Sequence, residues 1–127
     1  MTARLSLPDD FLSLAKKMVS LEKNLDGEAL IRTIMNRCYY AVYLALRQKL
    51  GLPPDTDHRT VYEEIKKRNV KLATYLDFLW ACRRGADYYL QNPVKIRGWQ
   101  IGFIVSFEIS KAIRCINIAQ SALIEAK

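Results

Sequence analysis

The chain has 127 residues, a length that fits one domain, residues 1–127, with its own hydrophobic core. Half of the residues are hydrophobic and about a quarter are charged, which excludes an intrinsically disordered chain. A formal net charge of +7 and a pI near 9.5 favour acidic partners such as RNA, DNA or an acidic protein.

Two helices are predicted in the first part of the chain. Apolar residues recur at helical spacing over 7–24 and again over 27–50. Gly51 and the following Pro53 and Pro54 end the second helix. One face of that helix is apolar, whereas the opposite face is polar and aromatic. The polar face carries Arg32, Asn36, Tyr40, Tyr43 and Arg47.

Three further helices are predicted after a loop over 52–57. They cover residues 58–68, 71–91 and 98–126, and no segment alternates convincingly in the manner of a strand. Long amphipathic helices joined by short loops predict an all-α fold, an antiparallel up-and-down bundle of four to five helices.

The spacing of the cysteines indicates whether the chain binds a metal, and the length of its apolar segments indicates whether it spans a membrane. Cys38, Cys82 and Cys115 are widely separated and lie in apolar helical contexts, which indicates neither a zinc site nor a disulfide framework. We expect buried free thiols in a reducing compartment, and no metal or other cofactor. The longest apolar stretch, 101–107, is too short to span a membrane, and the N-terminus lacks the features of a signal peptide. The expected location is the cytoplasm.

Two polar, aromatic-rich patches interrupt the apolar pattern of the helices. The first is Asn-Arg-Cys-Tyr-Tyr-Ala-Val-Tyr over 36–43, and the second is Arg-Arg-Gly-Ala-Asp-Tyr-Tyr over 83–89. Helices rarely bury arginine unless its charge is paired. The patches therefore indicate either a polar seam between two helices or a site for an anion or a base.

Each patch has two chemical interpretations. Arg37 beside Tyr40 can hold a phosphate with its guanidinium group while a ring stacks on a base. Alternatively, the tyrosines are half-buried packing residues and the arginine pairs with a carboxylate. A buried Asp87 requires such a partner, and Arg83, Arg84 or Arg37 from across the bundle can supply it.

Two further polar features lie near the third helix. His58, the single histidine, is predicted at the start of that helix, where it can face an anion held by backbone amides or form only local surface hydrogen bonds. A basic cluster follows at the junction with the fourth helix, and it can be a solvated face or can track a phosphate backbone. The cluster consists of Lys66, Lys67, Arg68 and Lys71.

These segments together resemble the HEPN family (higher eukaryotes and prokaryotes nucleotide-binding domain). The pattern comprises the patch at 36–43, the Leu-Gly break at 50–51, Thr-Asp-His at 56–58 and Arg-Gly-Ala-Asp-Tyr at 84–88. The similarity spans roughly residues 10–124. It implies a helical bundle that commonly dimerises, with polar sites near the dimer cleft.

The resemblance implies two kinds of activity. Many prokaryotic members are encoded beside a small nucleotidyltransferase, and others are metal-independent endoribonucleases of toxin–antitoxin or antiviral systems. Those ribonucleases use an arginine followed, after about four to six residues, by a histidine. None of Arg37, Arg83 and Arg84 is followed by histidine at that spacing, and no arginine stands at that distance before His58. The nuclease motif is absent, and tyrosine, with a pKa near 10, is a poor substitute near neutral pH.

We therefore predict a non-catalytic, homodimeric HEPN-type module that binds a nucleotide, RNA or a nucleotidyltransferase partner, with no catalytic residues. The candidate binding residues are Arg37, Tyr40, His58, Arg83, Arg84, Asp87 and Tyr88.

Two alternatives remain open at this stage. The first is a divergent metal-independent ribonuclease that uses Arg83 or Arg84 with Tyr88 or His58. The second is a purely structural, dimeric accessory subunit. In that subunit the two patches form a self-complementary polar seam, and Arg37 pairs with Asp87 inside it.

Overall fold

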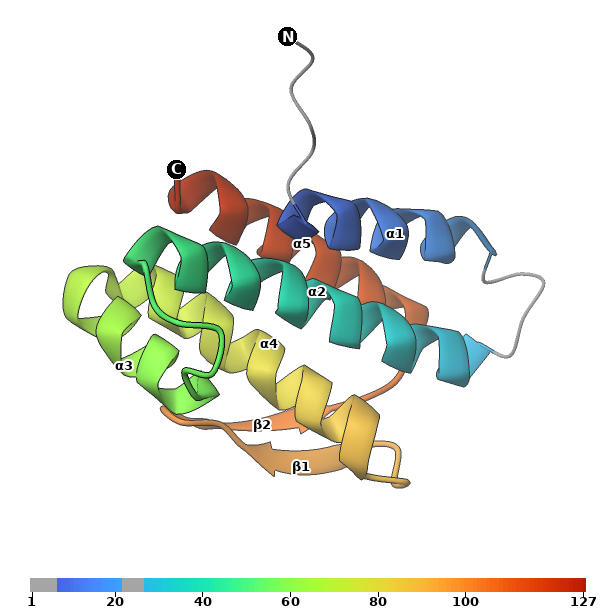
Figure 1. Cartoon of the computed structure of the whole chain (residues 1–127). Coiled ribbons are helices and arrows are strands. Elements are labelled where there is room, and N and C mark those ends of the chain that lie inside the picture. Colours follow the sequence, from blue (N-terminus) through green and yellow to red (C-terminus); the bar gives the residue numbers. More distant parts are fainter. Residues whose placement is uncertain (1–6, 22–26) are drawn as a thin grey trace, which may run out of the picture.

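The computed structural model describes residues 7–21 and 27–127. Within them lie five helices and one antiparallel hairpin (Figure 1). The elements are α1 (Leu7–Leu21), α2 (Gly27–Leu50), α3 (His58–Arg68), α4 (Val70–Tyr88), β1 (Val94–Arg97), β2 (Gly102–Val105) and α5 (Ile109–Glu125). None of the described helices is both long enough and apolar enough to cross a membrane.

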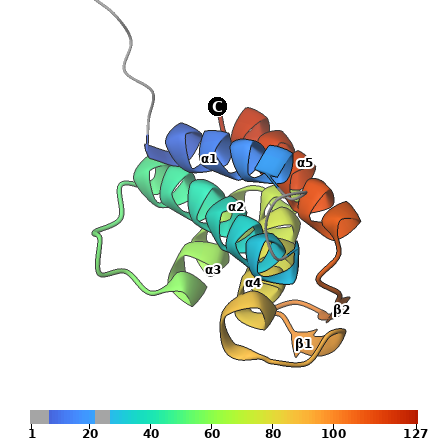
Figure 2. The same cartoon turned by 90° about the vertical axis from the view of Figure 1, so that its right-hand side faces the viewer.

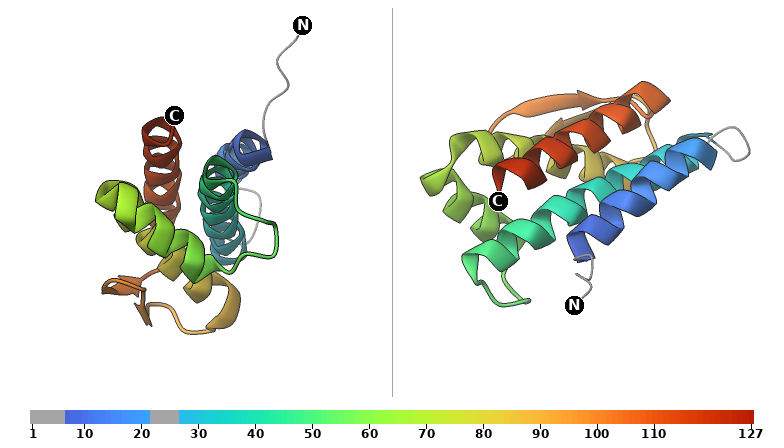
Figure 3. Two further views of the ribbon diagram at one scale, coloured as in Figure 1. Left: turned by 60° about the vertical axis from the view of Figure 1, so that its left-hand side comes forward. Right: turned by 90° about the horizontal axis from the view of Figure 1, so that it is seen from above.

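Helices α2 and α4 form the centre of the molecule, because every other element packs against at least one of them. Helices α1 and α5 both pack on α2, and the hairpin lies against α4 on the side away from α1 (Figure 2). Helix α3 lies at the end of the molecule where α2 and α5 finish (Figure 3). The face between α2, α3 and α4 is thus built from segments that are distant in sequence.

Local hydrogen bonds fix the boundaries of the central helices. Gly51 adopts a positive φ of 67°, a conformation that glycine tolerates best, and ends α2. The Asp57 side chain accepts a hydrogen bond from the Thr60 backbone N–H at 2.7 Å and caps the start of α3. Asn69 ends α3 with its own N–H and caps α4 by accepting from the Leu72 N–H at 3.1 Å.

The structure confirms the predominantly helical class, with an added small sheet. The predicted ranges 27–50 and 58–68 match α2 and α3. The last predicted residues of the first helix, 22–24, lie outside the described residues. The fifth helix was predicted from residue 98, and this is wrong because the hairpin occupies the segment before Ile109.

The hairpin was not predicted from the sequence, because each of its strands is only four residues long. In β1, buried Val94 and Ile96 alternate with exposed Lys95 and Arg97, which is the period of a strand with one buried face. The prediction that no segment alternates is therefore wrong for this part of the chain.

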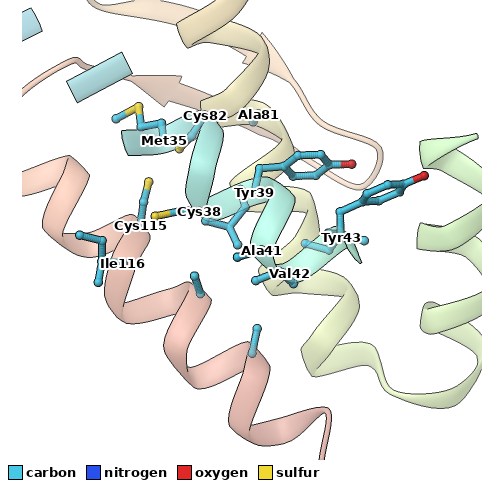
Figure 4. Close-up of a cluster of buried hydrophobic side chains, with 14 of the residues drawn as sticks. Met35, Cys38, Tyr39, Ala41, Val42, Tyr43, Ala81, Cys82, Cys115 and Ile116 are labelled. Carbon is cyan, nitrogen blue, oxygen red and sulfur yellow. The ribbon is translucent and has the colours of Figure 1, made fainter. Parts of the chain in front are cut away.

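The three cysteines are free and fully buried, as predicted, and they gather between α2, α4 and α5 (Figure 4). Burial raises the pKa of the Cys38 thiol to about 12. A hydrogen bond between Cys82 and Cys115, together with burial, raises the pKa of Cys115 well above its ordinary value. The Cys38 and Cys115 thiols therefore stay protonated, and all three cysteines act as small core side chains.

A buried carboxylate attaches the hairpin to α4. Asp77 is only 1% exposed, and its two oxygens accept hydrogen bonds from three consecutive backbone N–H groups of the turn between β1 and β2. The donors are Trp99 at 2.6 Å, Gln100 at 3.1 Å and Ile101 at 3.2 Å. The turn thus satisfies a charge that could not otherwise be buried.

The space beside Asp77 generates a stability prediction with a matched control. A Cβ at Gly98 would lie 2.4 Å from Asp77 Oδ1, whereas a Cβ at Gly102 would meet nothing closer than 3.8 Å. Gly98→Ala is therefore expected to lower the free energy of unfolding by about 1–3 kcal/mol, and Gly102→Ala to leave it nearly unchanged. Urea unfolding followed by circular dichroism measures both, and equal midpoints for the two variants would contradict the prediction.

Candidate functional site

The two predicted patches meet on the face formed by α2, α3 and α4, with Arg83 at their centre. Arg83 Nη2 donates hydrogen bonds to the hydroxyl oxygens of Tyr40 at 3.1 Å and Tyr88 at 3.3 Å. Arg83 Nε lies 2.9 Å from Asp87 Oδ2, a close ion pair whose N–H is not aligned with the oxygen. We call these four residues the Arg83 cluster.

Aromatic rings surround the Arg83 guanidinium. Its Cζ lies 5.2 to 6.0 Å from the ring centroids of Tyr39, Tyr40, Trp80 and Tyr88, within the range of cation–π attraction. The Arg83 side chain is only 11% exposed. Its Nη1 group makes no hydrogen bond to any residue that the structure describes. The cluster therefore holds a partly buried cation in a fixed orientation with one donor group to spare.

Arg84 supplies a second cation beside the first. Its Cζ lies 5.6 Å from the centroid of the Trp80 ring, and the side chain is half-buried. Over residues 7–21 and 27–127, Arg84 has neither an ion pair nor a hydrogen bond. An arginine that rests on an aromatic ring without a carboxylate keeps its charge available for an anion.

The predicted pair of Arg37 with Asp87 does not form. Arg37 Nη1 donates to Asn36 Oδ1 at 3.3 Å, and Asn36 Nδ2 donates to Asp87 Oδ2 at 3.0 Å, so Asn36 stands between the two charges. Adjacent helical residues point about 100° apart, which turns Arg37 toward α1, where its Cζ lies 5.6 Å from the Phe11 ring centroid. The partner of Asp87 is Arg83, one of the three arginines considered.

His58 contacts three of the aromatic rings that surround Arg83, those of Tyr39, Tyr40 and Trp80. Its Nδ1 shares a hydrogen bond of 2.5 Å with the Tyr39 hydroxyl, and its ring centroid is 4.4 Å from that of Tyr43 and 5.2 Å from that of Trp80. Burial lowers the pKa of His58, and the charge of Arg83 lowers it further. Burial raises the pKa of Tyr39 far above its ordinary value, so its hydroxyl keeps the proton.

Beside His58 lies an open groove of about 640 Å³, which we call the aromatic groove. Trp80 and Trp99 stack in it with centroids 4.3 Å apart and planes 11° from parallel. The Tyr62 ring centroid lies 5.1 Å from that of Trp99 with the planes tilted by 31°, so rings from α3, α4 and the hairpin are in contact. The groove is lined by Asp57, His58, Arg59, Thr60, Glu63, Glu64, Trp80 and Trp99.

The structure brings the predicted site residues together to different degrees. Tyr40, Asp87 and Tyr88 contact Arg83 directly. His58 and Arg84 join this group because both contact Trp80, and Arg37 is connected only through Asn36. Among the residues described, no group of His, Cys, Asp or Glu side chains has an arrangement that could hold a metal ion.

Two tryptophans of the site were missed by the sequence analysis. Trp80 was given no role beyond its place in the predicted helix 71–91, although its position three residues before Arg83 on the helix places both on one face. Trp99 was assigned to a helix. The turn residue Gly98 after the alternating strand β1 is the sequence signal that could have placed Trp99 in a hairpin turn.

Comparisons with protein-family models, with curated proteins and with solved structures found no match to this chain. The function is therefore inferred from the geometry of the site.

The surroundings of His58 predict how it titrates. Its folded-state pKa lies below the ordinary 6.5, so the unfolding free energy is highest above pH 6.5 and falls as the pH drops through the folded value. NMR titration of the single histidine ring measures this pKa directly. Arg83→Gln is expected to raise it, because the nearby positive charge is removed. A wild-type pKa at or above 6.5, or no change in the variant, would show that the account of His58 is wrong.

Proposed function

We propose that this chain is a non-catalytic HEPN-type module that binds a nucleotide or RNA, with the phosphate held by Arg84 and the Arg83 cluster. The observation that supports the proposal most strongly is the unpaired Arg84 beside an oriented Arg83, both resting on the Trp80 ring. Guanidinium groups bind phosphate with paired hydrogen bonds, and aromatic rings beside them stack on bases. The homodimer and the nucleotidyltransferase partner stay predictions of the family resemblance.

The charge balance of this face supports an anionic ligand. Arg83 and Arg84 contribute two positive charges, and Asp87 is the one carboxylate in contact with either of them within the described residues. Arg37, although turned toward α1, adds a third positive charge that is connected to Asp87 through Asn36. The whole chain also carries an excess of positive charge, +7. A local and a global excess of the same sign both attract a polyanion and speed its association.

The role of the arginines in binding can be tested by replacing two of them without unfolding the protein. Neither Arg37 nor Arg84 has an ion pair within the described residues, so Arg37→Ala combined with Arg84→Ala should fold. We expect it to weaken binding of a fluorescein-labelled single-stranded RNA at least about tenfold, since each arginine that neutralises a phosphate contributes to counterion release. The slope of log K against log salt should fall by about 0.7 for each phosphate that is no longer neutralised. Fluorescence anisotropy across a salt series measures both quantities.

Lys95→Ala combined with Arg114→Ala provides the matched control, because it also removes two positive charges, from exposed positions on β1 and α5. Circular dichroism verifies that all variants are folded. A folded Arg37→Ala and Arg84→Ala double variant that binds RNA as tightly as this control would refute the proposed function.

One observation favours the divergent ribonuclease as a second candidate. Although no arginine precedes His58 at the spacing of the nuclease motif, Arg83 and His58 both contact Trp80 and Tyr39 in the folded chain. A lowered pKa keeps His58 neutral near pH 7, as a general base requires. Against catalysis, Nδ1 of His58 is occupied by Tyr39, a residue whose hydroxyl keeps its proton.

An RNA-cleavage assay separates the two candidates. Purified protein is incubated with total RNA in the presence of a metal chelator, beside His58→Ala and Arg83→Gln variants. The proposed function predicts no difference in RNA integrity among the three samples. Cleavage by the wild type that is absent from both variants would establish the ribonuclease instead.

A further inference from the structure

The aromatic groove offers a surface for a planar ring, and its shape is fixed by the core. Asp77 holds the backbone of Trp99, and Asp77 and Trp80 are three residues apart on α4, so one helix face positions both tryptophans. Gly98 allows the turn to approach, because any larger residue would collide with Asp77. The stacked rings are therefore preorganised, and a ligand need not order them.

The wall of the groove formed by α3 is rich in hydrogen-bond acceptors. Glu63 uses Oε1 in an ion pair of 3.6 Å with Arg59, and Glu64 uses Oε1 in a bond of 3.1 Å with Lys67. The second carboxylate oxygen of each has no hydrogen bond to another described residue. Carboxylate oxygens accept and do not donate, so this wall selects a ligand edge that carries N–H donors.

The Trp80 ring connects the aromatic groove to the two arginines, which do not themselves line the groove. Trp80 lies in the groove, and the guanidinium groups of Arg83 and Arg84 lie 5.5 and 5.6 Å from its ring centroid. A ligand that places a ring on the tryptophans can therefore place a phosphate near the arginines.

We infer that the aromatic groove binds an unpaired nucleobase and favours guanine, an inference that rests on the proposed function. Guanine presents an N1–H and an amino group on one edge, and two donors side by side match a carboxylate. Uracil presents one N–H between two carbonyl oxygens, and those oxygens would face the carboxylates. The base belongs either to a free nucleotide or to a single-stranded RNA.

Binding measurements with four probes test this inference. GMP and UMP represent the free nucleotide, and the RNA pentamers UUGUU and UUUUU represent the strand. We expect UUGUU to bind about 5- to 150-fold more tightly than UUUUU, the range for one correctly paired base edge. GMP that binds as tightly as UUGUU would identify a free nucleotide as the ligand, and a large advantage of the pentamer would identify RNA.

Substitutions in the groove assign the preference to its residues. Glu63→Gln combined with Glu64→Gln should abolish the ratio between the two pentamers. The ratio of the two pentamer affinities is measured because the loss of two negative charges changes both affinities in the same direction. Glu108→Gln, at an exposed position before α5, is the control and should keep the ratio. Trp99→Leu should weaken both pentamers, and the glutamate variant tests the same groove if Trp99→Leu does not fold.

The outcomes separate this inference from the proposed function. Binding that depends on Arg84 but shows no guanine preference, or a preference that the glutamate variant keeps, would overturn the inference and leave the proposed function standing. Absence of any Arg84-dependent binding would remove both.

Discussion

The arrangement of this molecule depends on the buried carboxylate of Asp77. Three backbone N–H groups of the hairpin turn converge on it, so a charge that is costly to bury becomes the attachment point of the only described sheet. Because Trp99 is the first of these donors, the same contact fixes the ring that stacks on Trp80. Helix α4 carries Asp77, Trp80 and Arg83 at successive intervals of three residues. The same helix therefore holds both the attachment point of the hairpin and the central residues of the candidate site.

Most of the helical framework could be predicted from the sequence, because strong local signals determine it. The Gly51 and proline stop and the long apolar periodicity of α2 fixed its range without tertiary information. The hairpin is harder to predict, because β1 alternates over only four residues and β2 lies within an apolar stretch that also fits helical spacing. The hydrogen bonds from the turn to Asp77 hold the hairpin in place, and these tertiary contacts are not visible in the local sequence pattern.

The candidate site was predicted in its residue types but not in its pairings. Arg83 and Asp87, four apart on one helix, pair as local spacing allows. Arg37, one of the three arginines considered and the partner of Asp87 in the structural-subunit alternative, does not reach Asp87, because the rotation of α2 directs Asn36 there instead. The two interpretations of the patches are compatible in the structure. Asn36, Asp87 and Arg83 form a polar seam between α2 and α4, and Arg84 stays available beside it.

The central claim is that Arg84, the Arg83 cluster and the tryptophans form one binding surface. Its most direct test is a ¹H–¹⁵N NMR titration of the wild-type protein with a short single-stranded RNA, followed at the two tryptophan indole N–H signals and the α2 and α4 amides. Both indole signals and the amides around residues 36–40 and 80–88 are expected to shift together and saturably, while the amides of the exposed face of α5 stay in place. Saturable binding that shifts α5 and leaves both indole signals unchanged would contradict the claim.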